Sequence, residues 1–313
     1  MSYSKLLMSS NKGMALVLTI MILAIMTTMV VEFIHEVYST NASLNNWRVS
    51  RQLSLAAKSG ITIAKKIISD NQSRYAYTYP GKYELPLGNI FAEAAEAADG
   101  SGGKVLIRVE DENGKFNLNS TVWPNGTTNE ASIDLFKRLL KNIGLDEQIA
   151  YRVADWIDSD SESRMGGSEK GAKNAYMDSI DELTLMYGVD FRTYEALKPF
   201  VTVYGVDGIS SHLININSAS LPVILAFNAE ITEQLAERII KYRDLEPLER
   251  ASDLVKIAGF EGSLGQSLMG MIVVKAVNLR ITSLAEDDKI KRIIECVVEN
   301  YGGMFITKYW RER

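Results

Sequence analysis

The chain has 313 residues, of which 46% are hydrophobic and 23% are charged, and this balance is typical of a folded globular protein. Its formal net charge of -5 leaves no global excess of lysine and arginine to neutralise phosphates, which argues against a dedicated nucleic-acid-binding protein. The single cysteine, Cys296, excludes an internal disulfide and a cysteine-rich zinc site, and neither His35 nor His212 has a metal-ligand spacing.

Residues 14–31 form a mainly apolar run without a charge, a proline or a glycine. Such a run is long enough to cross a lipid bilayer as a helix, which needs roughly 17–25 residues. Lys5 and Lys12 precede it, and Glu32 and Glu36 follow it. By the positive-inside rule, the N-terminus is expected in the cytoplasm and the rest of the chain on the other side of the membrane.

The helical pattern continues beyond this run. Apolar residues recur at spacings of three and four between residues 33 and 68, with polar residues between them. This spacing predicts one long helix over residues 14–69, because residues three and four apart share one helix face. We expect the first part of the helix to lie in lipid and the second part to pack one face on a folded domain.

Gly13 stands directly before the apolar run, after a short basic leader. These residues resemble the N-terminus of type IV pilins and pseudopilins. The resemblance implies that a prepilin peptidase cuts after Gly13 and that Met14 becomes the methylated N-terminus. The fifth mature residue of this family is usually glutamate, whereas this chain has Leu18, and the difference fits a tip subunit with nothing above it.

The same resemblance implies that the apolar helix contacts membrane lipid and, after assembly, the helices of partner subunits. A signal anchor that is never processed is the alternative interpretation. The residues expected to make these contacts are Leu16, Leu18, Ile22, Ile25 and Phe33.

Strand signals lie on both sides of a mainly helical region. Residues 104–110 are rich in β-branched side chains, and a turn signal at 111–114 leads to residues 115–119. The sheet is expected to open before Ser120 and to resume after Met269, so that the stretch between them is an insertion. Three further strands are expected late in the chain, at 272–282, 290–298 and 304–310.

The composition of residues 71–103 predicts an irregular connection that contains a short alanine-rich helical piece at 91–98. These patterns together predict a division of the chain into several parts. They are a leader at 1–13, a pilin helix at 14–70, a sheet domain at 71–119 and 270–313, and an inserted helical domain at 120–269.

The predicted insertion contains an internal repeat. Residues 116–120 (FNLNS) recur as 214–218 (ININS), and the helical stretch 148–158 recurs as 234–244. Each copy reads as several short helices that pack on one another through alanine and isoleucine at helical spacing.

The second copy also resembles helix-hairpin-helix DNA-binding domains, and this resemblance gives the alternative function of a membrane-tethered DNA-binding protein of a DNA-uptake or pilus machine. Such a motif binds phosphate through a glycine-containing hairpin with free backbone N–H groups. The matching hairpin, residues 227–233, has no glycine and contains Glu230 and Glu233. We therefore favour packing over DNA binding and expect no nucleic-acid partner.

The first copy is longer than the second, and its additional residues are acidic. Asp158, Asp160 and Glu162 alternate with serine, and Glu169 follows after two glycines. Several carboxylates in a flexible stretch can converge on a hard cation such as calcium, which takes six to eight oxygen ligands. The spacing is not that of an EF-hand, and a solvated acidic loop is the alternative.

A set of motifs in a fixed order resembles the K-type minor pseudopilins of type II secretion systems. They are residues 111–119 (DENGKFNLN), 154–160 (ADWIDSD), 171–176 (GAKNAY), 181–183 (DEL) and 216–220 (INSAS). The family usually has glutamate where this chain has Lys173, which places a cation where an acid could ligate a metal.

The K-type resemblance implies an α+β fold, in which a pilin-like N-terminal helix packs on an antiparallel sheet. A large helical domain with two SAM-like or helix-hairpin-like repeats is inserted into that sheet. It also implies a non-enzymatic subunit that caps the pseudopilus tip with the I- and J-type minor pseudopilins and binds calcium in the inserted domain. The expected location is the cell inner membrane, with the C-terminal domain in the periplasm. No nucleophile–base or nucleotide-binding pattern argues for an enzyme.

Overall fold

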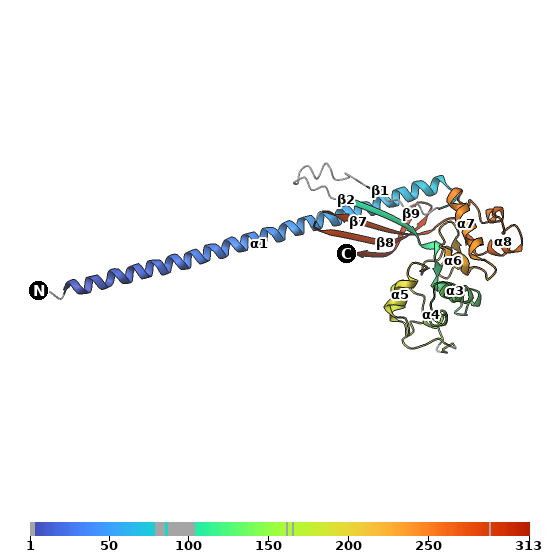
Figure 1. The fold of residues 1–313 in the computed structure, drawn as a ribbon, viewed down its shortest axis with the longest axis horizontal. Coiled ribbons are helices and arrows are strands. Elements are labelled where there is room, and N and C mark those ends of the chain that lie inside the picture. The colour runs from blue at the N-terminus through green and yellow to red at the C-terminus, as the bar shows by residue number, and fades with distance from the viewer. Residues whose placement is uncertain (1–3, 79–84, 87–103, 161, 165, 288) are drawn as a thin grey trace.

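A computed structural model describes residues 4–78, 85–86, 104–160, 162–164, 166–287 and 289–313. One long helix projects from a globular part that contains a sheet and a group of short helices (Figure 1). The helical piece expected at 91–98 lies outside the described residues.

Helix α1 (Ser4–Arg74) confirms the expectation of one continuous helix, and it is somewhat longer than the pattern predicted. Its apolar segment passes the length and composition test for a membrane-spanning helix, and no part of that segment is buried in the protein. The C-terminal part of α1 packs on the sheet. Its buried side chains are Leu53, Ala56, Ala57, Ile61, Ala64 and Ile68.

The sheet combines strands from both ends of the globular part. Its order is β1-β2-β7-β8-β9, and every pair in it is antiparallel. Alternate residues of the strands face α1, among them Ile107, Ile281 and Cys296, and they form a core with the helix. The strands are β1 (Leu85–Pro86), β2 (Lys104–Asp111), β7 (Asn278–Glu286), β8 (Lys291–Tyr301) and β9 (Met304–Glu312).

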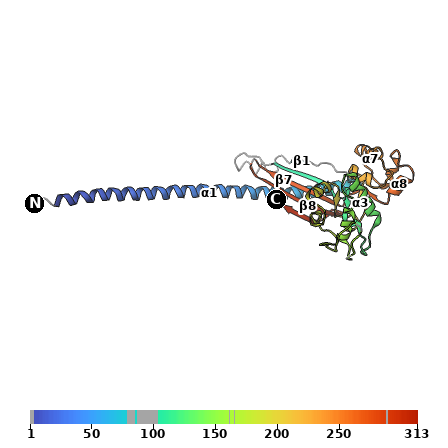
Figure 2. The ribbon, with the colours of Figure 1, turned by 60° about the horizontal axis from the view of Figure 1, so that its bottom comes forward.

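A mainly helical insert separates β2 from β7, as the sequence predicted, and it lies at the end of α1 that is remote from the N-terminus (Figures 1 and 2). Its first half contains η1 (Glu112–Gly114), β3 (Phe116–Asn117), η2 (Leu118–Thr121), α3 (Glu130–Asn142), α4 (Ile149–Ile157), η3 (Ile180–Leu185), α5 (Phe191–Leu197) and β4 (Val201–Thr202). Its second half contains β5 (Ile214–Asn215), α6 (Leu221–Ala226), α7 (Glu233–Leu245), η4 (Ala251–Lys256), α8 (Ser263–Leu268) and β6 (Ile272–Val273).

The two halves close in the same way. A two-residue strand at the start of each half pairs in parallel with one at its end, β3 with β4 and β5 with β6. In the first half, the buried Asn119 side chain bonds the backbone of Met177 and the carbonyl of Val203. In the second half, the buried Asn217 side chain forms the matching hydrogen bonds with the backbone of Leu248 and the carbonyl of Val274. The repeated Asn-x-Asn sequence therefore has a shared structural role.

The turn signal at 111–114 leads into β3, whose Phe116 and Asn117 pair with β4. The expectation of one strand over 272–282 was wrong, because the structure divides this stretch into β6 and β7. Asn113 Oδ1 accepts hydrogen bonds from the backbone N–H groups of Val277 and Asn278 at 2.8 and 2.7 Å, and it thereby anchors the chain where β7 begins.

Candidate functional site

The acidic loop begins at the C-terminal end of α4. This helix buries Ala150, Val153 and Ala154 against the core of the insert, and its last turn carries two further buried residues, Asp155 and Asp158. Asp158 is the C-cap of α4, and its backbone N–H donates to the carbonyl of Ala154 at 2.9 Å. The rigid helix end therefore fixes both carboxylates where water cannot fully solvate them.

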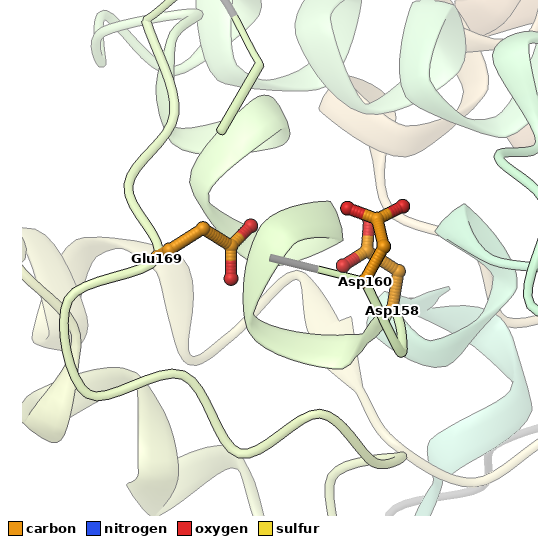
Figure 3. A group of neighbouring side chains, drawn as sticks. All are labelled: Asp158, Asp160 and Glu169. Atoms are coloured by element: carbon orange, nitrogen blue, oxygen red, sulfur yellow. The ribbon is translucent and has the colours of Figure 1, made fainter. Parts of the chain in front are cut away.

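Three of the expected metal ligands come together at this helix end. Asp158, Asp160 and Glu169 each offer a carboxylate oxygen, and these atoms lie within 4.8 Å of one another. Glu169 approaches from a different stretch of chain than the two aspartates (Figure 3). Within the described part of the chain, the buried atoms Asp158 Oδ1 and Glu169 Oε1 have no hydrogen-bond partner. Unpaired buried carboxylate oxygens are costly, and a cation bound to these two atoms would remove that cost.

The electrostatics of the cluster agree with this geometry. Burial raises the pKa of Glu169, and the negative charges of Asp155, Asp158 and Asp160 raise it further. Burial likewise raises the pKa of Asp158, although Arg164 partly offsets this effect. A cation at the cluster would relieve the repulsion that these carboxylates exert on one another.

Glu162, the fourth expected ligand, lies outside this group, and its side chain is exposed. Its contribution is local, because its backbone N–H donates to Asp160 Oδ1 at 2.8 Å and holds the turn. Lys173 does not enter the cluster either. Its ammonium pairs with Asp178 at 2.7 Å and with Glu182 at 3.0 Å, so the lysine that departs from the family pattern leaves the cation position open.

Two residues that were not among the expected ligands, Asp155 and Arg164, also take part in the cluster. Arg164 Nη1 donates to Asp155 Oδ1 at 2.5 Å and also to Asp158 Oδ2, and Nη2 donates to Thr128 Oγ1 at 2.5 Å. The spacing of three between Asp155 and Asp158 could have placed both carboxylates on one helix face. Nothing in the sequence pattern indicated that Arg164 returns to them.

The donor set fits a hard divalent cation. All available groups are carboxylate oxygens, which calcium prefers, and no sulfur or imidazole ligand is present among the described residues of the cluster. Gly167 allows the loop to approach α4, because a Cβ at this position would collide with the Asp155 carboxylate. With one oxygen from each side chain, the three residues supply fewer than the six to eight oxygens that calcium takes, so further carboxylate, backbone or water oxygens would complete the shell.

The expected membrane and partner-contact residues are solvent-accessible in the isolated chain. Leu16, Leu18, Ile22, Ile25 and Phe33 expose between 47% and 66% of their surface. Gly13 and Met14 lie within α1 and are exposed, and cleavage between them remains a prediction.

The hairpin compared above with DNA-binding motifs is used for packing. Arg138 of α3 donates to the carbonyls of Ala226 and Phe227 at 2.7 and 3.2 Å and fixes the hairpin to the first half of the insert. The exposed Glu230 and Glu233 stand at the turn that would have to meet phosphate. This charge is unfavourable for nucleic-acid binding.

The architecture and the motif order agree with comparisons to known proteins. Two family models, both described as type II secretion system (T2SS), protein K, match residues 114–206 and 214–275, which together cover both halves of the insert. The chain belongs to the type II secretion system protein K family. Members of this family are structural, non-enzymatic components of the secretion system.

Curated relatives extend the similarity beyond the insert. Protein K of Pseudomonas aeruginosa is 32% identical over 173 residues, which are 50% of this chain and 49% of the relative, so the match spans about half the relative's length. Protein K of Pectobacterium carotovorum is 25% identical over 257 residues, which are 75% of this chain and 76% of that protein.

A solved structure shows the same fold. It is the crystal structure of the GspK-GspI-GspJ complex from enterotoxigenic Escherichia coli, which matches with a TM-score of 0.60 at 16% identity. The match covers 86% of this chain and 98% of the other. The α+β architecture of this K-family protein, with its long helix, antiparallel sheet and helical insert, is thereby confirmed.

Proposed function

We propose that this protein is a minor pseudopilin that caps the tip of a type II secretion pseudopilus and supports protein secretion across the outer membrane. Family membership supports the proposal, and one feature of the fold carries it. Helix α1 separates an exposed apolar segment at one end of the molecule from a bulky helical insert at the other (Figure 1). In a filament of parallel helices, such an insert would occupy the space above the subunit and limit further growth.

Residues 14–31 are proposed to cross the inner membrane once and to leave the globular part in the periplasm. The segment is uncharged and mainly apolar, and Lys5 and Lys12 precede it on the side that the positive-inside rule places in the cytoplasm. After assembly, the same surface would contact partner helices instead of lipid, since tight packing of apolar side chains suits both environments.

The proposed partners are the I- and J-type minor pseudopilins, because the structurally similar GspK was solved in complex with GspI and GspJ. Contact through Leu16, Leu18, Ile22, Ile25 and Phe33 is supported by their exposure on α1. A prepilin peptidase is the proposed processing partner at Gly13.

Two measurements test this role. Mass spectrometry of the protein purified from membranes should find a mature chain that starts at methylated Met14, and an intact leader would contradict the proposal. Co-purification with I- and J-type subunits should persist when residues 120–269 are replaced by a short glycine–serine linker. Loss of both partners with the insert would show that the insert, rather than α1, makes the contacts.

We also propose that Asp158, Asp160 and Glu169 hold a calcium ion. Two buried oxygens without a hydrogen-bond partner among the described residues, Asp158 Oδ1 and Glu169 Oε1, support this proposal. A bound ion would neutralise the carboxylates and tie the loop that carries Glu169 to the end of α4. The full-length protein in detergent should melt at a higher temperature with calcium than with chelator. Asp160→Asn should abolish this shift, while Asp178→Asn, which removes an exposed carboxylate outside the cluster, should keep it.

We further infer that the two halves of the insert are SAM-like or helix-hairpin-like repeats that serve packing. The matching parallel strand pairs and the matching roles of Asn119 and Asn217 support this interpretation.

A further inference from the structure

The positively charged side chain of Arg164 already contacts the acidic cluster. Its guanidinium connects Asp155 and Asp158 at the end of α4 to Thr128, which precedes α3. Both aspartate side chains are fully buried, whereas the side chain of Arg164 is 20% exposed. The arginine therefore neutralises two buried carboxylates, and its side chain is the only one of the three that reaches solvent.

Asp158 is shared between this ion pair and the proposed calcium site. Its Oδ2 accepts from Arg164, and its buried Oδ1 has no hydrogen-bond partner in the part of the chain that the structure describes, so Oδ1 is the oxygen that remains for an ion. A divalent cation on Oδ1 would lie about one carboxylate width from the guanidinium. Two cations at that distance repel each other strongly inside a protein, where water screens them poorly.

The number of ligands also indicates that calcium would replace Arg164 at the cluster, and that the two would not be bound together. With one oxygen each, the three side chains of the proposed site supply fewer oxygens than calcium takes, and Arg164 holds one further oxygen of Asp158 and one of Asp155. Release of the arginine would free both atoms. The long side chain of Arg164 is partly exposed and can rotate toward solvent, whereas the aspartates belong to a packed helix end.

We propose that Arg164 is a resident competitor that holds the acidic cluster in its ion-free state and is displaced when a divalent cation binds. The inference rests on the proposed calcium site and assigns its regulation. The arginine stabilises the empty cluster, and its competition weakens calcium binding, so the site fills only when calcium is abundant.

Calcium titrations of the full-length protein in detergent, measured by calorimetry, test this assignment. Arg164→Gln removes the competing charge, so it should bind calcium roughly ten-fold or more tightly than wild type, while its calcium-free form melts at a lower temperature. Arg164→Lys keeps the charge and should bind calcium with an affinity close to that of wild type. Weaker or unchanged binding by Arg164→Gln would overturn the competition and leave the calcium site standing.

A second measurement needs no substitution. Phenylglyoxal modifies accessible arginines, and mass spectrometry can compare their reactivity with calcium and with chelator. Calcium should increase the reactivity of Arg164 and leave that of Arg280, which is paired with Glu112 and Glu295, unchanged. Continued protection of Arg164 in the calcium-bound protein would overturn the inference. If neither wild type nor Arg164→Gln binds calcium, the calcium site itself is refuted and the inference falls with it.

Discussion

Asp111 and Ser218 are joined by a buried hydrogen bond that links the end of β2 to the second half of the insert. Ser218 Oγ donates to Asp111 Oδ2, and Asn215 Nδ2 donates to the same oxygen at 2.7 Å. Asp111 Oδ1 accepts from the backbone N–H of Asn113 at 2.7 Å. One carboxylate thus fixes the sheet, the turn that follows it and the start of the second repeat relative to one another.

The buried position of Asp111 predicts a pH dependence of stability. Burial is the largest influence on its pKa and raises it from 3.8 to about 6, although the hydrogen bonds from Ser218, Asn113 and Asn215 oppose the shift. The folded state therefore binds this proton more tightly than the unfolded state does. The free energy of unfolding should fall by up to about 3 kcal/mol as the pH rises from 4 to 6.

Asp111→Asn removes this titration, and it should flatten the pH profile between these two values. Chemical denaturation at several pH values measures the free energy of unfolding of both proteins. The contributions of the other titrating groups are the same in both proteins and cancel in the difference between them. An equally steep profile in the variant would show that Asp111 does not cause the dependence.

Glu112 lies next to Asp111, but its pKa is shifted in the opposite direction. Burial alone would raise its pKa, but the charges of Lys115 and Arg280 more than offset this and lower the pKa to about 2. Arg280 Nε lies 2.6 Å from Glu112 Oε1, and Arg280 Nη1 lies 2.5 Å from Glu295 Oε1. Glu112→Gln should destabilise the protein by about 3–5 kcal/mol, since it removes the buried carboxylate charge that the largely buried Lys115 and Arg280 share.

The matched control for this substitution is Glu237→Gln, which breaks the exposed i,i+4 pair with Lys241 and should cost at most about 0.5 kcal/mol. Urea denaturation at neutral pH compares the two variants. Similar small losses in both would mean that the network around Glu112 contributes little net stability.

Gly60 allows α1 to approach the sheet closely. A Cβ at this position would collide with Ser283 Oγ and would lie 3.2 Å from Val105 Cγ1. Gly60→Val should therefore destabilise the packing of α1 on the sheet by about 1–3 kcal/mol. In Gly270→Ala, the added methyl meets open space and should change the midpoint very little. Thermal unfolding of the two variants tests the prediction, and equal midpoints would contradict it.

Local patterns in the sequence predicted the elements that depend on local physics. The spacing of apolar residues gave α1, and the β-branched stretch at 104–110 gave β2, because helix and strand periodicity are properties of neighbouring residues. The pairing of Phe116 with Val201 could not be predicted in this way, since it depends on how the 84 residues between them fold. For the acidic cluster, four ligands were predicted and three of them come together. The contact of Arg164 and the exposed position of Glu162 could not be predicted, because loop geometry decides both.

The internal repeat supports a final prediction about Asn119 and Asn217. Asn119 makes three hydrogen bonds with backbone groups of Met177 and Val203, and Asn217 makes its three with Leu248 and Val274. Both asparagines are completely buried, so replacement by alanine leaves buried N–H and carbonyl groups unsatisfied. Each alanine variant should lose about 2–4 kcal/mol of stability.

Asn142→Ala is the control, because its exposed side chain makes one hydrogen bond, to the carbonyl of Pro222 at 3.1 Å, and its loss should cost less than about 1 kcal/mol. Denaturant unfolding measures all three variants. The two asparagines make matching hydrogen bonds, so Asn119→Ala and Asn217→Ala should lower the free energy of unfolding by similar amounts. A large loss in only one half would mean that the repeats keep the same sequence motif without an equal energetic role.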